Sequence, residues 1–294
     1  MATAKRFDAP INGVLTDAMV RSWHDDGYLI LENYVTADQC KAIMNRSAEI
    51  VEEIGPDALG EVFDAVDNSH GNDDYFLTSG DKIRVFFESG IHDLDGNLTV
   101  PLARAANKIG HAMHDLDPVF DAFSRTIKLA NTANSIGLAA PGLLQSMVIF
   151  KHAHVGGEVG LHQDSTFIIT EPESCIGFWF ALEDATTSNG AMKALPGGHT
   201  GPLAQIYRRD DNGGVGMTQL AEPAWNLESL VDLEAPQGTL ILLHGRLPHQ
   251  SAPNISEKSR QAYTLHVIDT KMEYPTNNWL YRPETMPLRG FRTS

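Results

Sequence analysis

The sequence predicts an antiparallel β-sandwich or β-barrel with helices from the N-terminal part packed on it. Three observations support this fold class. Before about residue 140, apolar residues recur mainly at helical spacing, with capping residues at segment ends. From about Leu144, they form short runs of β-branched and aromatic residues separated by Gly, Pro, Asn and Asp. Between those runs there is no helical segment long enough for the crossovers of a parallel sheet.

Helices dominate the first part of the predicted order. The clearest helix is capped by Thr36, and Gln39 three residues later completes a capping box. Another begins at Thr16 and ends at Gly27. In chain order we expect a helix at 16–27, a strand at 28–31, and helices at 36–54, 100–113 and 119–136.

Strands dominate the second part, and each is a short apolar run bounded by turn residues. The expected strands are 146–150, 166–170, 176–182, 239–243 and 262–268. Two connections, 68–74 and the glycine-rich 186–216, have the length and composition of either binding loops or plain surface loops. No repeat or linker divides the chain, so we expect one domain over residues 1–294, with a helical part to about 140, a strand-rich core at about 141–270 and a C-terminal extension at 271–294.

Composition and charge exclude several classes of protein. A net charge of −16 repels nucleic acid and anionic lipid, so neither is expected as a partner. No apolar run approaches the roughly 18 residues of a membrane span, and the first ten residues lack the apolar core of a secretory signal. Cys40 and Cys175 are too few for a disulfide framework or a thiolate metal site. We therefore expect a reducing, cytoplasmic setting.

The segment that indicates chemistry contains His162 and Asp164, at the edge of a predicted strand. Residues i and i+2 of a strand face the same side, so the imidazole and the carboxylate would point at one position. A second histidine from another strand would complete the 2-His-1-carboxylate triad of non-haem Fe(II) oxygenases. The spacing alone is weak, because about one such pair is expected by chance among 12 histidines. The pair His24/Asp26 repeats it within a predicted helix, where the two side chains point apart.

Two histidines could supply the third ligand. His244 and His249 both follow the apolar run at 239–243, and the residue pattern by itself leaves both open. Arg260 lies eleven residues after His249. An arginine in that place would suit a keto acid that chelates iron, because the guanidinium binds the free distal carboxylate through two parallel hydrogen bonds.

These residues resemble the phytanoyl-CoA dioxygenase family of Fe(II)/2-oxoglutarate oxygenases. The resemblance is carried by fixed spacings, namely His162 and Asp164, then His249 followed by Ser251, Asn254 and Arg260. It extends over most of the chain, in the segments 74–84, 107–111, 156–159, 183–186 and 259–264. This register favours His249 over His244 as the third ligand.

The resemblance implies a double-stranded β-helix (jelly-roll) core at about 141–270. It implies Fe(II) ligands at His162, Asp164 and His249, and a clamp for the distal carboxylate of 2-oxoglutarate at Arg260, with Ser251 beside it. Three more positions match residues that line the cosubstrate pocket in such enzymes: Lys108, Met147 and Trp179. Substrate contacts are expected from Tyr75, Phe86, Phe87 and the connection at 186–216.

The implied function is oxidation of a C–H bond in a small molecule, with O2 and 2-oxoglutarate consumed and succinate and CO2 released. The carboxylate of Asp164 favours hydroxylation, since related halogenases need a small residue there for chloride to bind iron. Three alternatives are a cupin-like metal enzyme that does not use 2-oxoglutarate, a binding module with an inactive site, and desaturation, epoxidation or cyclisation by the same iron centre. The sequence defines neither the substrate, including whether it is a CoA thioester, nor the oligomeric state.

Overall fold

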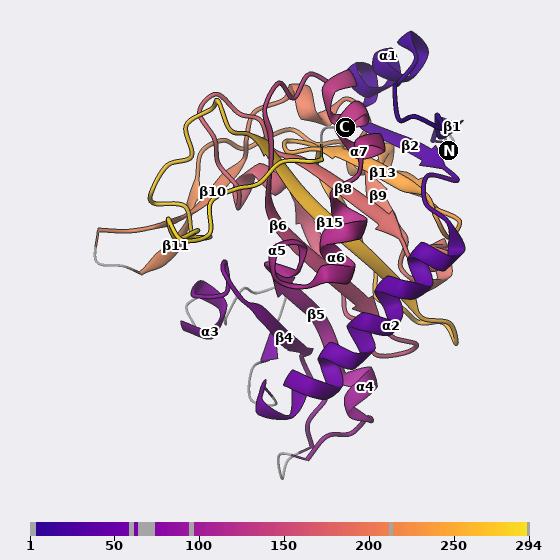
Figure 1. Cartoon of the computed structure of the whole chain (residues 1–294), viewed down its shortest axis with the longest axis vertical. Coiled ribbons are helices and arrows are strands. Elements are labelled where there is room, and N and C mark those ends of the chain that lie inside the picture. Colours follow the sequence, from indigo (N-terminus) through magenta and orange to yellow (C-terminus); the bar gives the residue numbers. More distant parts are fainter. Residues whose placement is uncertain (1–3, 59–61, 64–73, 94–96, 212–213, 293–294) are drawn as a thin grey trace.

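The computed structural model describes residues 4–58, 62–63, 74–93, 97–211 and 214–292 (Figure 1). In this part of the chain, nine strands form one large sheet in the order β1-β2-β13-β8-β15-β6-β5-β4-β3. Its strands are β1 Arg6–Asp8, β2 Tyr28–Glu32, β3 Val62–Phe63, β4 Ile83–Glu88, β5 Ala106–His111, β6 Pro141–Lys151, β8 Ile176–Ala181, β13 Leu240–His244 and β15 Arg260–Asp269. All neighbours are antiparallel except β1 with β2 and β3 with β4.

A smaller sheet of four strands has the order β12-β9-β14-β7, and β10 with β11 forms a separate hairpin. The bounds are β7 Val159–His162, β9 Met192–Ala194, β12 Val231–Leu233, β14 His249–Ser251, β10 Gln205–Arg209 and β11 Val215–Gln219. The hairpin projects from the left side of the molecule in Figure 1, and the C-terminal segment lies beside it, joined by a bridge between Arg208 and Asn278.

The helices are α1 Asp17–Asp26, α2 Ala37–Ile54, α3 Asp74–Leu77, α4 Leu102–Ala105, α5 Met113–Leu116, α6 Pro118–Ser124 and α7 Ile127–Ser135. Short 3-10 turns are η1 Gly55–Ala58, η2 Asp164–Thr166, η3 Thr187–Asn189, η4 Gly198–Thr200 and η5 Leu227–Ser229. The first two helices begin and end where the sequence predicts. Thr16 caps α1, Gly27 ends it in the left-handed conformation, and Thr36 and Gln39 form the capping box of α2. Among the described helices, none is long and apolar enough to cross a lipid bilayer.

The large sheet has two different faces because alternate residues of each strand point to opposite sides. On one face, helices α2, α6 and α7 cover the sheet. That core contains Leu29, Leu31, Phe178, Phe180, Leu240, Leu242, Tyr263 and Leu265 of the sheet, with Ile43, Ile50, Phe120, Phe123 and Leu129 of the helices. The opposite face packs on the small sheet through Trp179, Ala181, Ile241, Leu243, Ala262, Met192, Ala194, Val231 and Leu233. The predicted antiparallel sandwich with outer helices is confirmed, and it has the jelly-roll arrangement.

Two predicted elements are wrong. The helix expected at 100–113 is one turn, α4, followed by strand β5, which pairs with both β4 and β6. Pairing on two sides outweighs the helix-like pattern of that segment. The strand expected at 166–170 is instead a 3-10 turn and an irregular stretch, in which the amide of Ile168 donates to the carbonyl of Asp164.

Other expectations hold only in part. The helix expected at 119–136 is divided into α6 and α7, because Thr126 caps a new helix. The first 140 residues supply strands β1 to β5 as well as helices. The glycine-rich connection at 186–216 contains strands β9 and β10 and two 3-10 turns. Of the connection at 68–74, residues 68–73 lie outside the described residues.

Candidate active site

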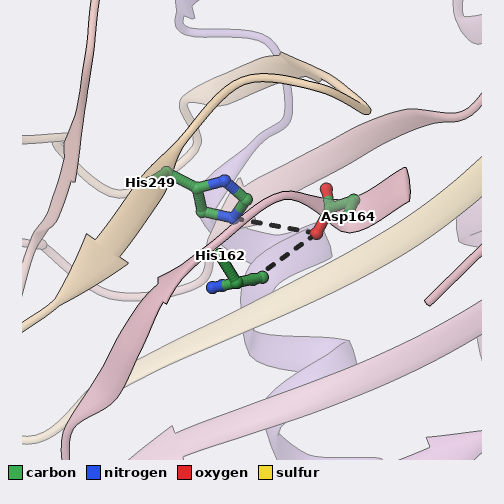
Figure 2. Close-up of side chains that lie close together, drawn as sticks. All are labelled: His162, Asp164 and His249. Atoms are coloured by element: carbon green, nitrogen blue, oxygen red, sulfur yellow. Dashed lines mark ion pairs between the residues drawn. The ribbon is translucent and has the colours of Figure 1, made fainter. Parts of the chain in front are cut away.

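Three side chains that can bind a metal converge between the two sheets (Figure 2). His162 ends β7, Asp164 begins η2, and His249 begins β14 directly opposite His162 in the small sheet. Asp164 Oδ1 lies 3.6 Å from His162 Nε2 and 3.7 Å from His249 Nε2. One ligand atom from each residue lies within 4.8 Å of the other two. The expectation that both members of the first pair lie in a strand is wrong for Asp164, but the turn after β7 still brings its carboxylate to the histidines.

Backbone carbonyls orient both histidine rings of this cluster. His162 Nδ1 is 2.8 Å from the carbonyl oxygen of Gly160, and His249 Nδ1 is 2.9 Å from that of Leu247. A carbonyl oxygen only accepts, so each ring donates its Nδ1–H and keeps the lone pair of Nε2 free. Metal-binding histidines are held in this way by their outer hydrogen bonds. The two Nε2 lone pairs and the carboxylate therefore face one position.

The ionisation of His249 and Asp164 suits a divalent cation, whereas for His162 burial acts to lower the pKa and the neighbouring Asp164 carboxylate raises it above its ordinary value. Burial lowers the pKa of His249 to about 4, with a contribution from His162, so its ring is neutral at pH 7. Burial alone would raise the pKa of Asp164, but the neighbouring histidines, His266, His249 and His162, hold it well below its ordinary value. Two imidazoles and an ionised carboxylate form a facial donor set that leaves other metal positions open.

The alternative ligand His244 lies elsewhere. Its ring packs between Trp23, at a centroid distance of 5.9 Å, and His199, at 5.0 Å. Its Nδ1 accepts a hydrogen bond from the backbone amide of Arg246. The structure thus brings His249, and not His244, to His162 and Asp164.

The cluster lies in a cavity of about 640 Å³, a size typical of small-molecule sites. All five residues expected to bind the cosubstrate line it, namely Lys108, Met147, Trp179, Ser251 and Arg260. Lys108 is on strand β5 rather than on a helix. Burial lowers the pKa of Lys108 to about 7, although the charge of Glu88 acts in the opposite direction.

Arg260 is the most unusual of these residues because its charge is deeply buried. It begins β15 and is 1% exposed. Nη2 donates to the carbonyl of Gly190 over 2.7 Å, and the guanidinium lies 5.5 Å from the centre of the Trp179 ring. Its Nε has no partner, and within the described part of the chain it forms no ion pair. Such a guanidinium is ready to bind an incoming carboxylate.

The three residues expected to contact substrate do not line the cavity. Phe87 is fully buried in the core under the helices, because it and Phe86 point to opposite faces of β4. Phe86 packs behind Phe76, with their ring centres 5.9 Å apart, and the Tyr75 hydroxyl donates to the carbonyl of Val85. The neighbouring Phe76 lines the cavity instead.

Several residues that line the cavity were not expected from the sequence: Glu88, His111, Gln145, Met217, Trp225, His266 and Trp279. The connection at 186–216, from which substrate contacts were expected, does line the cavity, through Met192, Ala204, Gln205 and Tyr207. His266 Nε2 is 3.4 Å from Asp164 Oδ2. It could have been found, because it shares the face of β15 that Arg260 and Thr264 occupy at even spacing. Trp279 gave no such signal, since the chain returns to the site only after β15 has ended.

Comparison with known proteins supports the same family. The model of the phytanoyl-CoA dioxygenase (PhyH) family matches residues 23–262. The chain is 41% identical over 282 residues to phytanoyl-CoA dioxygenase domain-containing protein 1 of Rattus norvegicus, covering 93% of this chain and 97% of that protein. It is 38% identical over 273 residues to phytanoyl-CoA dioxygenase of Arabidopsis thaliana, covering 92% and 95%.

Solved structures with the same fold are more distant in sequence. The non-haem α-ketoglutarate-dependent carbocyclase SnoK from nogalamycin biosynthesis has a TM-score of 0.64 and 14% identity, covering 96% of this chain and 99% of that one. EctD from S. alaskensis, solved with 2-oxoglutarate and 5-hydroxyectoine, has a TM-score of 0.61 and 19% identity, covering 99% and 88%. The extent of the family match and the identity to full-length relatives show that the chain belongs to the phytanoyl-CoA dioxygenase family.

Proposed function

We propose that this protein is an Fe(II)- and 2-oxoglutarate-dependent dioxygenase that hydroxylates a C–H bond of a small molecule. The observation that carries the proposal is the pairing of two features in one cavity. The first is a cluster of two oriented imidazoles and a carboxylate, and the second is a buried guanidinium without a carboxylate partner in the described structure. His162, Asp164 and His249 would hold the iron, and Arg260 with Ser251 would hold the distal carboxylate of 2-oxoglutarate.

When bound, the iron and 2-oxoglutarate would supply the reaction with O2 that releases succinate and CO2 and oxidises the substrate. The protein's own residues would bind, orient and exclude water. The carbonyls of Gly160 and Leu247 fix the two histidine rings. Met147 and Trp179 would form apolar walls around the cosubstrate, and Lys108 would add positive charge near its carboxylates. Arg260 also counts against a cupin-like enzyme that uses no keto acid, because that chemistry has no need of a buried cation.

We also propose that residues 1–294 form a single catalytic domain. Strands from distant parts of the chain share the large sheet, since β1 contains Arg6–Asp8 and β15 contains Arg260–Asp269. Neither the helices nor the small sheet could bury their apolar faces without that sheet.

The test is 2-oxoglutarate turnover by the purified protein loaded with Fe(II) and given a panel of metabolites under air. We expect succinate release in proportion to product, and loss of it in His162→Ala and Asp164→Ala with the circular dichroism spectrum unchanged. The matched pair is His249→Ala, expected to be inactive, and His244→Ala, expected to be active. Full turnover without any keto acid would overturn the proposal.

A further inference from the structure

The side chain of His111 lies in the wall of the active-site cavity and has one unsatisfied nitrogen. The residue is 1% exposed and lines the cavity together with Phe76 and Trp279. Its Nδ1 is 2.7 Å from the hydroxyl oxygen of Ser79. Its Nε2 is buried and has no hydrogen-bond partner among the described residues. Buried polar atoms are nearly always paired, so an unpaired one in a cavity wall indicates a partner that arrives from outside.

The hydrogen bonds around Ser79 define which nitrogen of His111 carries the proton. The Ser79 hydroxyl has one hydrogen, and it donates that hydrogen to the carbonyl oxygen of Phe76, which can only accept. Ser79 Oγ must therefore accept from His111 Nδ1–H. Nε2 is then left with its lone pair, as a hydrogen-bond acceptor. Burial also lowers the pKa of His111 well below its ordinary value, with a contribution from Lys108, so the ring stays neutral at pH 7.

Aromatic rings surround this acceptor. Phe76 and Trp279 are stacked on each other with ring centres 4.4 Å apart, and each meets the imidazole of His111 edge-on, at 5.7 Å and 5.5 Å. The ammonium of Lys108 lies 5.1 Å from the centre of the Phe76 ring. The pKa of Lys108 is lowered to about 7, so its protonated form, present in part at pH 7, would repel a cationic ligand but not an uncharged one. The surroundings favour a flat or apolar group that carries a neutral hydrogen-bond donor.

We propose that His111 determines substrate specificity, because its Nε2 accepts a hydrogen bond from a neutral hydroxyl or N–H group of the substrate. The apolar body of that substrate lies against Phe76 and Trp279. The inference rests on the proposed function, since it names the class of molecule that the same site oxidises. A site that hydrogen-bonds one substrate group binds an analogue that lacks the group more weakly, because the buried acceptor is then left unpaired.

Phenol and anisole are a suitable pair of probes, since they share a ring and differ in the donor. The full chain, labelled with 15N-histidine, is studied as purified and again with Zn(II) and 2-oxoglutarate. We expect His111 Nε2 to resonate as an unprotonated ring nitrogen, identified by its loss in His111→Phe. Phenol should shift that resonance and bind roughly five- to tenfold more tightly than anisole, as expected for one added hydrogen bond. His111→Phe should bind the two probes equally.

A second variant keeps the test valid if His111→Phe does not fold. Ser79→Ala retains the imidazole but removes its proton acceptor, so it should mix the two ring tautomers and reduce the preference for phenol. A protonated Nε2 in the free wild-type protein, or equal affinity of the wild type for phenol and anisole, would overturn the inference. These measurements need no turnover, so they stand if the protein releases no succinate. Succinate release without a preference for phenol would remove only the role of His111.

Discussion

Replacing Arg260 by methionine separates what the guanidinium costs the fold from what it contributes to cosubstrate binding. Arg260 is 1% exposed, and its one hydrogen bond in the described structure is from Nη2 to the carbonyl of Gly190. Burial lowers the pKa of Arg260 from its ordinary value to about 10. A base with a lower pKa in the folded state than in the unfolded chain costs stability at every pH below the folded value, so the full cost is present at pH 7.

The two effects have opposite signs. The lowered pKa of Arg260 corresponds to about 3 kcal/mol of destabilisation. Replacing Arg260 removes this destabilisation, but it also removes the hydrogen bond to Gly190, which lowers the free energy of unfolding by about 1–3 kcal/mol. Without cosubstrate, Arg260→Met should therefore be as stable as the wild type, or up to about 2 kcal/mol more stable. The same variant would lose the buried charged pair that we propose with 2-oxoglutarate, worth about 2–5 kcal/mol, so the affinity for 2-oxoglutarate should fall by tens-fold to thousands-fold.

The measurement is urea unfolding at pH 7 with and without 2-oxoglutarate, together with calorimetric titration of the cosubstrate into the metal-loaded protein. Arg21→Met is the control, because Arg21 is exposed on α1 and does not line the cavity. This variant should change neither the stability nor the affinity for 2-oxoglutarate. Arg260→Lys keeps the charge but not the planar fork, so its affinity should be intermediate. An Arg260→Met protein that binds 2-oxoglutarate within threefold of the wild type would refute the reasoning. So would one that is more than 3 kcal/mol less stable without the cosubstrate.

Three further predictions concern the metal cluster and a buried lysine. His249→Ala should lose high-affinity Fe(II) or Zn(II) binding while His244→Ala keeps it, as measured by calorimetry; the reverse result would mean that the third ligand is wrongly assigned. Asp164→Gly should lose substrate oxidation and, once metal-loaded, bind chloride or another small anion, and wild-type turnover by this variant would exclude Asp164 as a ligand. Burial lowers the pKa of Lys151 to about 7 from 10.5, so the unfolded chain binds more protons above pH 7 than the folded one. The free energy of unfolding should therefore rise between pH 7 and pH 9 by about 2 kcal/mol more in the wild type than in Lys151→Met, whereas equal slopes in urea unfolding would contradict it.

The sequence predicts correctly those features that depend on interactions between residues close in the chain. The capping box at Thr36 and the left-handed Gly27 mark helix ends through contacts within a few residues, and the structure has both. The three residues of the metal cluster could be predicted for a related reason. His162 and Asp164 are neighbours in sequence, and the register after His249 distinguished it from His244.

Long-range pairing explains what the sequence did not reveal. Strand β5 is specified by its neighbours β4 and β6, so its own residues resemble a helix. Phe86 and Phe87 are adjacent residues of β4, so they point to opposite faces of the sheet. Which of them points to the side of the cavity depends on how β4 pairs with β5, and the sequence of β4 does not reveal that. That pairing places Phe87 in the helix-side core and Phe86 behind Phe76. Trp279 reaches the cavity from a segment that no local pattern connects to it.

The segment after β15 forms part of the cavity wall, although it belongs to neither sheet. Within the described residues, the strands of both sheets and all three residues of the metal cluster precede Trp279 in the sequence. The same segment carries Arg282 and Arg289, which pair with Asp115 at the end of α5. The sheets and this part of the cavity wall are therefore supplied by separate segments of the sequence. Substitutions in the segment after β15 can therefore reshape the cavity beside Trp279 while leaving His162, Asp164 and His249 unchanged.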